Sequence, residues 1–262
     1  MKPVLAMVFA YCMSPVTVAV GAAAEEPSQV LALIKAYPDF LDRIDGNDLV
    51  WKDGTRMSID DKKGTKDFET LLEKPDIKDQ FAMIYPLGRP AAGPPQPNSD
   101  PGRVRNMPLF DKMYGDCTKA ETLPKLVEII WLPKRSGEKL KITAVNGVAE
   151  RLAAVSRELD ELSNEFLKFL KPTSGTYNCR VIAGTDRVSA HGHGIAIDIN
   201  SDQSDYWMWA KPDSNGLYPY RNRVPYEIAE IFEKHGFIWG GKWYHYDTMH
   251  FEFRPELFIK VN

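Results

Sequence analysis

The sequence predicts an α+β fold: a small, mainly antiparallel sheet with helices packed to one side, preceded by an N-terminal helical and hairpin extension. Two observations predict it. Apolar residues recur at helical spacing in some stretches and alternate with polar residues in others, and glycine and proline separate these stretches. In addition, no segment of the 262 residues repeats itself, which excludes repeat architectures.

The first residues have the layout of a secretory signal peptide. In MKPVLAMVFAYCMSPVTVAVGAAA a single lysine precedes an apolar run, and small residues stand directly before EEPS. We therefore predict a signal peptide over residues 1–24. An uncleaved membrane anchor is the alternative, but Pro3, Pro15 and the short apolar run disfavour it. We expect an exported protein, periplasmic or extracellular, without stable membrane insertion after cleavage.

Charge and cysteine content narrow the possible partners. The net charge is −3 and no basic tract is present, so the sequence argues for neither nucleic acid nor anionic lipid as a partner.

Removal of the signal peptide leaves Cys117 and Cys179, and two cysteines in an oxidising compartment often pair. We expect a disulfide, with two unrelated buried thiols as the alternative.

The chain divides into three regions after the signal peptide. Residues 25–85 form an accessory region of mixed pattern, residues 86–108 a linker or surface strap rich in proline and glycine, and residues 109–262 the main domain. Within the accessory region, residues 30–44 have helical spacing, and Asp53-Gly54 predicts a hairpin turn.

The main domain opens with two predicted strands and a long helix. KLVEIIWLP and KLKITAVNG flank a turn at Ser136-Gly137. The following 24 residues, GVAERLAAVSRELDELSNEFLKFL, predict an amphipathic helix that faces the core. Its apolar stripe consists of Val148, Leu152, Val155, Leu159, Leu162 and Phe166.

The segment HGHGIAIDIN places a carboxylate in a strand that should be buried. Gly192 and Gly194 allow a sharp turn, after which Ile195 and Ile197 point to one face of the strand and Asp198 to the other. A buried carboxylate must be paired, hydrogen-bonded or bound to a metal. An ion pair with an arginine is the structural alternative to metal binding.

A second segment, DTMHFEF, offers complementary chemistry. Phe251 and Phe253 share one face of a predicted strand, and His250 and Glu252 share the other. A histidine and Asp198 from the first segment, with a histidine from this one, would form a zinc site with its fourth position open to water. Asp247, three residues before His250, would then be a carboxylate suited to act as general base.

The two segments together carry a family resemblance. SAHGHGIAID fits S-x-H-x-x-G-x-A-x-D, DTMH fits a carboxylate-x-x-H pattern, and GFIWGGKW precedes the second motif. Over about residues 175–257 the chain resembles the zinc D-alanyl-D-alanine carboxypeptidase and L-alanyl-D-glutamate endopeptidase family of peptidoglycan peptidases. The resemblance implies that His191, Asp198 and His250 bind Zn²⁺ on the predicted sheet, and that Asp247 is the catalytic carboxylate.

The same resemblance implies further roles. Arg180 would stabilise the oxyanion or a substrate carboxylate, although a structural ion pair is an alternative for it. The implied substrates are peptidoglycan stem peptides, and either the terminal D-Ala–D-Ala bond or an internal bond such as L-Ala–D-Glu would be cut. Candidate substrate-binding residues are Ser189, His245 and Trp243.

Other readings of the motif region remain. A non-catalytic module that binds cell-wall peptide or a protein partner could use the same fold, but all four expected site positions are occupied by suitable residues. His193 is expected either beside the site or exposed in the glycine turn. His235 is expected at the end of a helix capped by Gly236.

Overall fold

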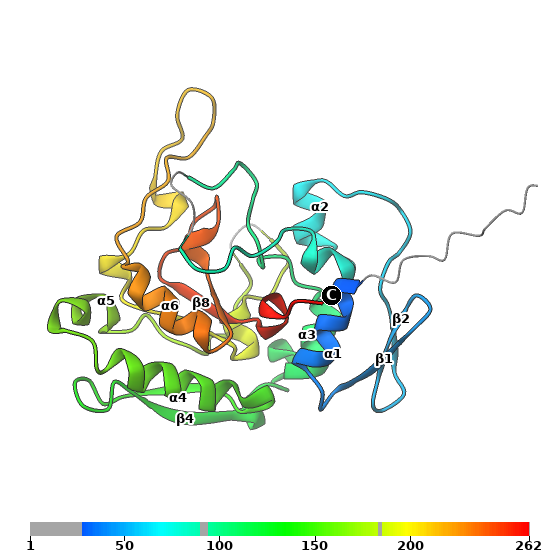
Figure 1. Cartoon of the computed structure of the whole chain (residues 1–262), viewed down its shortest axis with the longest axis horizontal. Helices are drawn as coiled ribbons and strands as arrows, with labels where there is room; N and C mark the ends of the chain where they lie inside the picture. Colours follow the sequence, from blue (N-terminus) through cyan, green and yellow to red (C-terminus); the bar gives the residue numbers. More distant parts are fainter. Residues whose placement is uncertain (1–27, 90–93, 183–184, 262) are drawn as a thin grey trace, which may run out of the picture.

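The computed structural model describes residues 28–89, 94–182 and 185–261, and the predicted signal peptide over residues 1–24 lies outside them. It is an α+β structure with small antiparallel sheets (Figure 1). The α-helices are α1 (Leu31–Ala36), α2 (Phe68–Glu73), α3 (Met107–Tyr114), α4 (Val148–Leu159), α5 (Leu167–Leu170) and α6 (Tyr226–Lys234). The strands are β1 (Leu41–Asp45), β2 (Asp48–Trp51), β3 (Arg56–Ser58), β4 (Leu126–Trp131), β5 (Glu138–Thr143), β6 (Ala196–Asp198), β7 (Phe237–Trp239) and β8 (His250–Phe253). Within the described residues no helix is long and apolar enough to cross a membrane.

The accessory region forms a helix and a three-stranded meander. Strands β1, β2 and β3 pair in order, and the turn after β2 contains Asp53 and Gly54, with Gly54 at φ +83°, so the predicted hairpin is confirmed. The helix predicted over residues 30–44 is wrong in its second half, because α1 ends at Ala36 and β1 follows. Pro38 explains the break, since it lacks an N–H donor and restricts the residue before it.

The hairpin and helix predicted at the start of the main domain are present, with one correction. Strands β4 and β5 pair antiparallel, and α4 packs on them with its apolar stripe buried. The helix stops at Leu159, however, and Leu162 and Phe166 follow outside it. The carboxylate of Asp160 instead accepts hydrogen bonds from the backbone N–H of Lys134 and from Arg135, which ties the helix end to the β4–β5 turn.

The sheet that carries the motif residues is separate from the other two. Its strand order is β6-β8-β7 with antiparallel pairing, so the small antiparallel sheet predicted to carry the motif residues is present. Among the described residues, strands β1-β2-β3 and β4-β5 form two further small sheets. In the antiparallel register Asp198 lies opposite His250, and Ala196 lies opposite Glu252. These four residues therefore share one face of the sheet. On the other face, Phe251 stacks on Phe232 of α6 at a ring-centroid distance of 3.8 Å.

The accessory region and the main domain share one hydrophobic core. Buried residues of α1 and β2 belong to the same cluster as Phe251 and Phe253. The hydroxyl of Tyr37 donates to Glu256 at 2.6 Å, and Figure 1 shows the C-terminal end of the chain beside α1. The two regions are therefore packed together.

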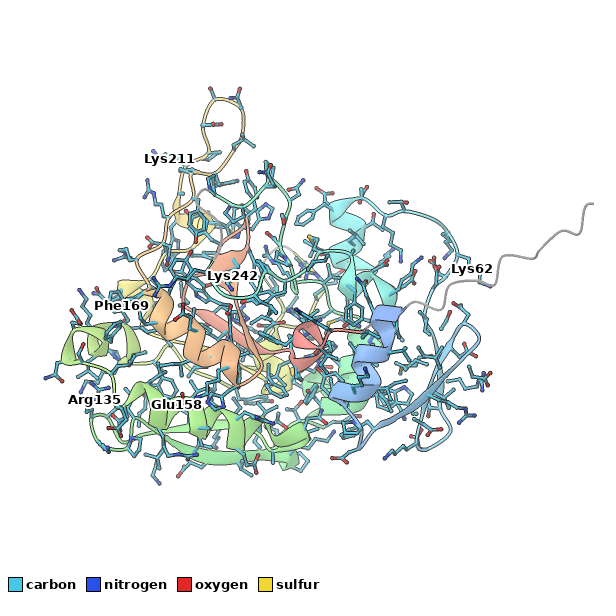
Figure 2. All side chains as sticks on the ribbon, viewed as in Figure 1. Lys62, Arg135, Glu158, Phe169, Lys211 and Lys242 are labelled. Atoms are coloured by element: carbon cyan, nitrogen blue, oxygen red, sulfur yellow. A yellow bond between two sulfur atoms is a disulfide. The ribbon has the colours of Figure 1, made fainter. Side chains whose placement is uncertain are left out.

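Residues 86–108, which we call the strap, are anchored to the main domain at both ends. Lys242, labelled in Figure 2, is buried and donates to the carbonyl oxygens of Pro86 and Gly88 at 2.8 and 2.7 Å. Further along, the guanidinium of Arg254 donates to the carbonyl oxygens of Gly102 and Val104. The strap is therefore fixed against strand β8.

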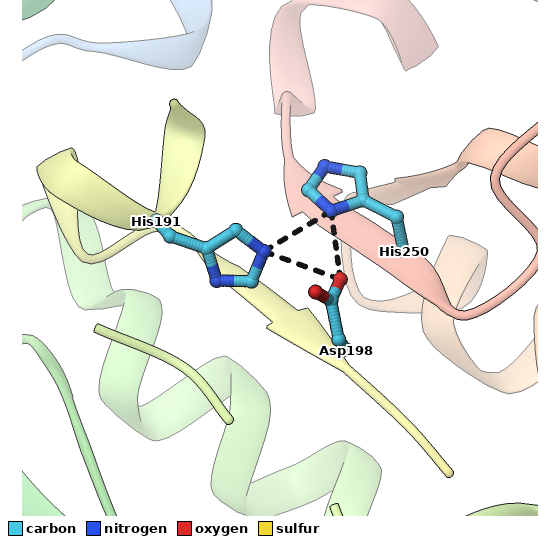
Figure 3. A group of neighbouring side chains, drawn as sticks. All are labelled: His191, Asp198 and His250. Carbon is cyan, nitrogen blue, oxygen red and sulfur yellow. Dashed lines mark hydrogen bonds and ion pairs between the residues drawn. The ribbon is translucent and has the colours of Figure 1, made fainter. Parts of the chain in front are cut away.

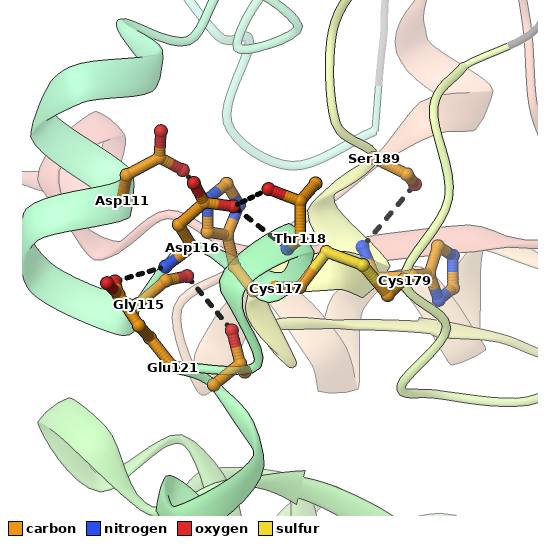
Figure 4. The surroundings of a disulfide bond; sticks show 11 residues. Asp111, Gly115, Asp116, Cys117, Thr118, Glu121, Cys179 and Ser189 are labelled. Carbon is orange, nitrogen blue, oxygen red and sulfur yellow. Dashed lines mark hydrogen bonds and ion pairs between the residues drawn. A yellow bond between two sulfur atoms is a disulfide. The ribbon is translucent and has the colours of Figure 1, made fainter.

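The predicted disulfide is present. Cys117, directly after α3, is bonded to Cys179, which precedes the motif segment (Figure 4). The motif turn lies close to this bond, because a Cβ on Gly192 would lie 2.9 Å from the sulfur of Cys117 and 2.6 Å from Val188. Glycine at position 192 therefore lets the turn pack against the disulfide.

Replacement of both cysteines by serine is expected to lower the free energy of unfolding by about 2–4 kcal/mol. The bond joins residues 62 apart in sequence, and its loss frees that loop in the unfolded chain. Urea unfolding followed by tryptophan fluorescence measures the loss, and reduction of the wild type should reproduce it. An unchanged unfolding midpoint in the double variant would contradict the expectation.

Candidate metal centre and active site

Three side chains from two sequence segments meet at the surface of the β6-β8-β7 sheet. His191 lies in a 3₁₀ turn (Ala190–His193) that Ser189 caps and Gly194 ends at φ +67°, while Asp198 ends β6 and His250 begins β8. The Nε2 atom of His191 lies 3.2 Å from Oδ1 of Asp198 and 3.3 Å from Nδ1 of His250 (Figure 3). The third edge, from His250 Nδ1 to Asp198 Oδ1, is 3.0 Å.

This triangle fits a tetrahedral metal ion. A zinc ion with ligand bonds of about 2.0–2.1 Å separates its ligand atoms by about 3.3 Å. The three edges, 3.0–3.3 Å, match that separation. Two imidazole nitrogens with one carboxylate oxygen are also donors that zinc prefers. The group could therefore hold a metal ion with one coordination position left over.

Both histidine rings are oriented by partners on their far side. The Nδ1 atom of His191 contacts the carbonyl oxygen of Thr176, and Nε2 of His250 lies 3.1 Å from Oε2 of Glu252. A nitrogen that donates to these acceptors carries the ring proton, so the lone pair of each ring is left on the nitrogen that faces Asp198. The contacts with Thr176 and Glu252 therefore leave Nε2 of His191 and Nδ1 of His250 as the ligand atoms.

The outer contact of His250 belongs to a chain of buried charges. Both oxygens of Glu252 accept from Nη1 of Arg105, at 2.8 and 3.2 Å, and Oε1 also lies 3.3 Å from Arg254. Arg254 in turn donates to Glu256 at 2.5 Å, and Glu256 accepts from Tyr37. A continuous network thus joins the candidate metal centre to the strap and to α1.

The electrostatics of the centre favour the charged forms of Asp198 and His250. Burial alone would raise the pKa of Asp198, but His191 and His250 outweigh it and hold that pKa well below its usual range. Burial alone would lower the pKa of His250, but hydrogen bonds to Asp198 and Glu252 raise it to about 10. A metal ion that binds Nδ1 of His250 must therefore displace a proton.

Asp247 lies beside this group in a partly buried position. Its backbone N–H donates to Gly240, where a Cβ would approach the Asp247 carbonyl oxygen to 2.5 Å, so glycine permits the contact. Among the described residues, its Oδ1 atom is buried without a hydrogen-bond partner. Burial and the nearby charge of Asp198 raise the pKa of Asp247 to about 6. A carboxyl group with these properties can both accept and release a proton near neutral pH.

A cavity of about 370 Å³ opens onto these residues, and we call it the metal cavity. Asp198, His250 and Asp247 line it, together with Arg180, which is exposed. Of the residues predicted to bind substrate, two line it as well: these are Ser189 and Trp243.

His245 lies elsewhere. Its Nδ1 atom is 2.9 Å from Asp100, and its ring stacks on Phe68 of α2. It lines an adjoining cavity of about 670 Å³, which we call the outer cavity. The two cavities have lining residues in common: Arg103, Ile182, Tyr206 and Met208. His245 is therefore on the wall of a continuous groove, away from the triangle of ligand atoms.

Sequence reasoning missed part of the wall of the metal cavity. The missed residues are Arg103, Arg105, Tyr206, Met208 and Trp209. The sequence held a weak signal for the two arginines, because GRVR interrupts the proline-rich strap. It also held one for the three other residues, because YWMW concentrates large side chains in a loop. The strap thus contributes directly to the site.

The two remaining histidines have structural partners. His193 is fully buried, 2.8 Å from Asp111 of α3, so the alternative that it is solvent-exposed is wrong. His235 follows α6 and pairs with Glu158 of α4, and Gly236 adopts φ +86°, so the predicted helix end is confirmed.

Comparison with protein families identifies the motif segment. A family model described as D-alanyl-D-alanine carboxypeptidase matches residues 183–253. The resemblance predicted from the sequence is confirmed. The matched segment contains the triangle of ligand atoms and Asp247, whereas Arg180, Cys179 and the strap lie outside it. Comparisons with curated proteins and with solved structures found no match.

Asp247→Asn is expected to stabilise the metal-free protein at neutral pH. A carboxyl with a pKa of about 6 in the folded state, against its usual 3.8, binds its proton more tightly when folded. The stability that the folded protein gains by binding this proton is therefore lost as pH rises from about 4 through about 6. Above that window the variant should gain up to about 3 kcal/mol over the wild type.

Urea unfolding of both proteins with a chelator present measures this difference on each side of the pH window. A difference that does not grow as pH rises would contradict the assigned environment of Asp247. Added zinc should reduce the difference, because a nearby cation compensates the charge of the wild-type carboxylate.

Proposed function

We propose that the chain is an exported zinc metallopeptidase that hydrolyses a peptide bond in the stem peptide of peptidoglycan. The observation that carries the proposal is the triangle formed by His191, Asp198 and His250, which suits a tetrahedral ion. Two of its members, Asp198 and His250, line the same cavity as Asp247. The family match over residues 183–253 supports a peptidase of this class. Two bonds are candidates, D-Ala–D-Ala and L-Ala–D-Glu.

The roles of the residues follow from their positions. Zinc held by the three ligands would lower the pKa of a water molecule and polarise the scissile carbonyl group. Asp247, with an unpaired oxygen and a pKa raised to about 6, accepts the proton of the attacking water and delivers it to the leaving amine as the C–N bond breaks. Arg180, exposed on the cavity wall, donates to the carbonyl oxygen as negative charge develops there.

Ser189 and Trp243, the two predicted substrate-binding residues on the cavity wall, position these groups. The hydroxyl of Ser189 accepts from the backbone N–H of His191 at 3.4 Å, so it supports the turn that carries a ligand. The ring of Trp243 lies 5.7 Å from that of His250, and its Nε1 donates to Pro101 of the strap. Trp243 therefore forms an apolar wall whose orientation is fixed.

The proposal assigns a place to each region of the chain. Residues 1–24 direct export, and residues 109–262 carry the peptidase site, to which the strap at 86–108 contributes a wall. Residues 25–85 are an accessory region that packs on the same core. The disulfide between Cys117 and Cys179 is consistent with an oxidising compartment outside the cytoplasm.

Digestion of purified muropeptides by residues 25–262 tests the proposal. We expect products that disappear when a zinc chelator is added, because the three ligands hold the ion on which hydrolysis depends. Mass spectrometry of the products separates loss of terminal alanine from scission within the stem. Bound zinc without any product from any stem peptide would contradict the proposal and favour the binding-module reading.

Two variants are expected to separate metal binding from proton transfer. Asp247→Asn should retain zinc and lose hydrolysis by about 100-fold or more, because the proton acceptor is removed. His250→Ala should lose zinc itself, because one of three ligands is removed. Metal content by atomic emission and the muropeptide assay measure both effects.

His235→Ala is the matched control, since this histidine pairs with Glu158 of α4 and does not line the metal cavity. It should keep both zinc and activity. Hydrolysis by Asp247→Asn at the wild-type rate, or full zinc occupancy in His250→Ala, would overturn the corresponding assignment.

A further inference from the structure

We propose that Arg103, which the strap supplies, binds a carboxylate of the substrate next to the scissile bond. The site would then select peptides in which that carboxylate is free. This inference rests on the proposed function and deepens it, because it names a specificity residue that lies 80 residues before the start of the family match.

Arg103 occupies the junction of the groove. It lines both the metal cavity and the outer cavity, so a peptide that lies along the groove with its scissile bond at the metal centre passes this residue. Tyr206 and Met208 line the same junction from the opposite segment of the chain. A charge at this point therefore contacts a peptide that spans both cavities.

The side chain of Arg103 is held ready to bind. Its Nη1 atom donates to Asp100 at 2.7 Å, its guanidinium carbon lies 5.5 Å from the centre of the Trp243 ring, and the side chain is 15% exposed. Asp100 is itself fixed by the backbone N–H and Nδ1 of His245. A planar guanidinium fixed at one nitrogen still presents N–H donors in the geometry that suits a carboxylate.

The other two arginines of the metal cavity are suited to different tasks. Arg105 donates from Nη1 to both oxygens of Glu252 and is buried, so its charge is already compensated. Arg180 is exposed on the wall and is assigned to the scissile carbonyl oxygen. Arg103 combines a fixed position with access to both cavities.

The charge of the metal cavity supports an anionic ligand. A divalent ion would compensate the carboxylates of Asp198 and Asp247, and Glu252 compensates Arg105. Arg103 shares one charge with Asp100, and Arg180 adds a further positive charge. The loaded cavity is therefore positive overall, which attracts a carboxylate and disfavours an amide in its place.

Two carboxylates of a stem peptide carry the required chemistry: the C-terminal carboxylate and the α-carboxylate of the D-glutamyl residue. Conversion of each to an amide removes one charge while it changes the shape very little. Four synthetic stem peptides, with each of these two groups as acid or amide, distinguish the two sources. The measured quantity is kcat/KM for each peptide with the zinc-loaded full mature chain.

In the wild type, amidation of the recognised carboxylate should lower kcat/KM about 10- to 100-fold, as expected for loss of a charge-assisted hydrogen bond. Arg103→Met should lose a similar factor on the acid peptide and should treat acid and amide alike. Arg103→Lys keeps the charge but loses the planar fork, so it should restore part of the preference.

Arg89→Met is the matched control. Arg89 also belongs to the strap, pairs with the carboxylates of Glu227 and Glu230, and lies 5.9 Å from the ring of Tyr226, but it lines neither cavity. Its replacement should leave both kcat/KM and the acid-to-amide ratio unchanged. Melting temperature and zinc content, measured for every variant, identify any loss of fold.

A purely structural role of Arg103 would lower the rates on all peptides by the same factor and leave the ratio intact, and that result would overturn the inference. Equal wild-type rates on all four peptides would overturn it too, while the proposed function would stand. A wild type that cuts none of the peptides would overturn both.

Discussion

The buried carboxylate of Glu252 is the point on which the rest of the structure depends. It orients the ring of His250 on one side, and on the other its charge is compensated by Arg105 of the strap and by Arg254. Removal of one member of such a buried ion pair costs about 3–5 kcal/mol, because the remaining charge is left without a partner. The geometry of the candidate metal centre therefore depends on a residue 147 positions earlier in the chain.

This dependence explains why the chain folds around one core although its sequence divides into regions. The strap delivers Arg103 and Arg105 to the site with Val104 buried between them, and Arg254 holds the strap backbone by its carbonyl oxygens. The accessory region supports the same network, since Tyr37 donates to Glu256. A segment that reads as a linker by composition is in the structure a wall of the groove.

Strand alternation visible in two short segments indicated Asp198 and His250, and the family resemblance added His191, which lies in a turn. The same alternation placed Asp198 opposite to Ile197 and His250 opposite to Phe251, and the register shows that Asp198 and His250 share one face of the sheet. Pro38 and Asp160 end helices that apolar spacing alone would have extended. Arg103 and Arg105 could not be found in this way, since their roles arise from contacts with residues far along the chain, and no local period records such contacts.

The two strap arginines stand two residues apart, and they constrain change in the chain differently. Arg105 is tied into the buried network, so its replacement would disturb the centre itself. Among the described residues, Arg103 is held by Asp100 and by the face of Trp243, where the metal cavity and the outer cavity meet. Under the proposed roles, a change at position 103 alters substrate preference, while Arg105 preserves the geometry of the candidate metal centre. Under those roles, single substitutions outside the segment that the family model matches are enough to change specificity.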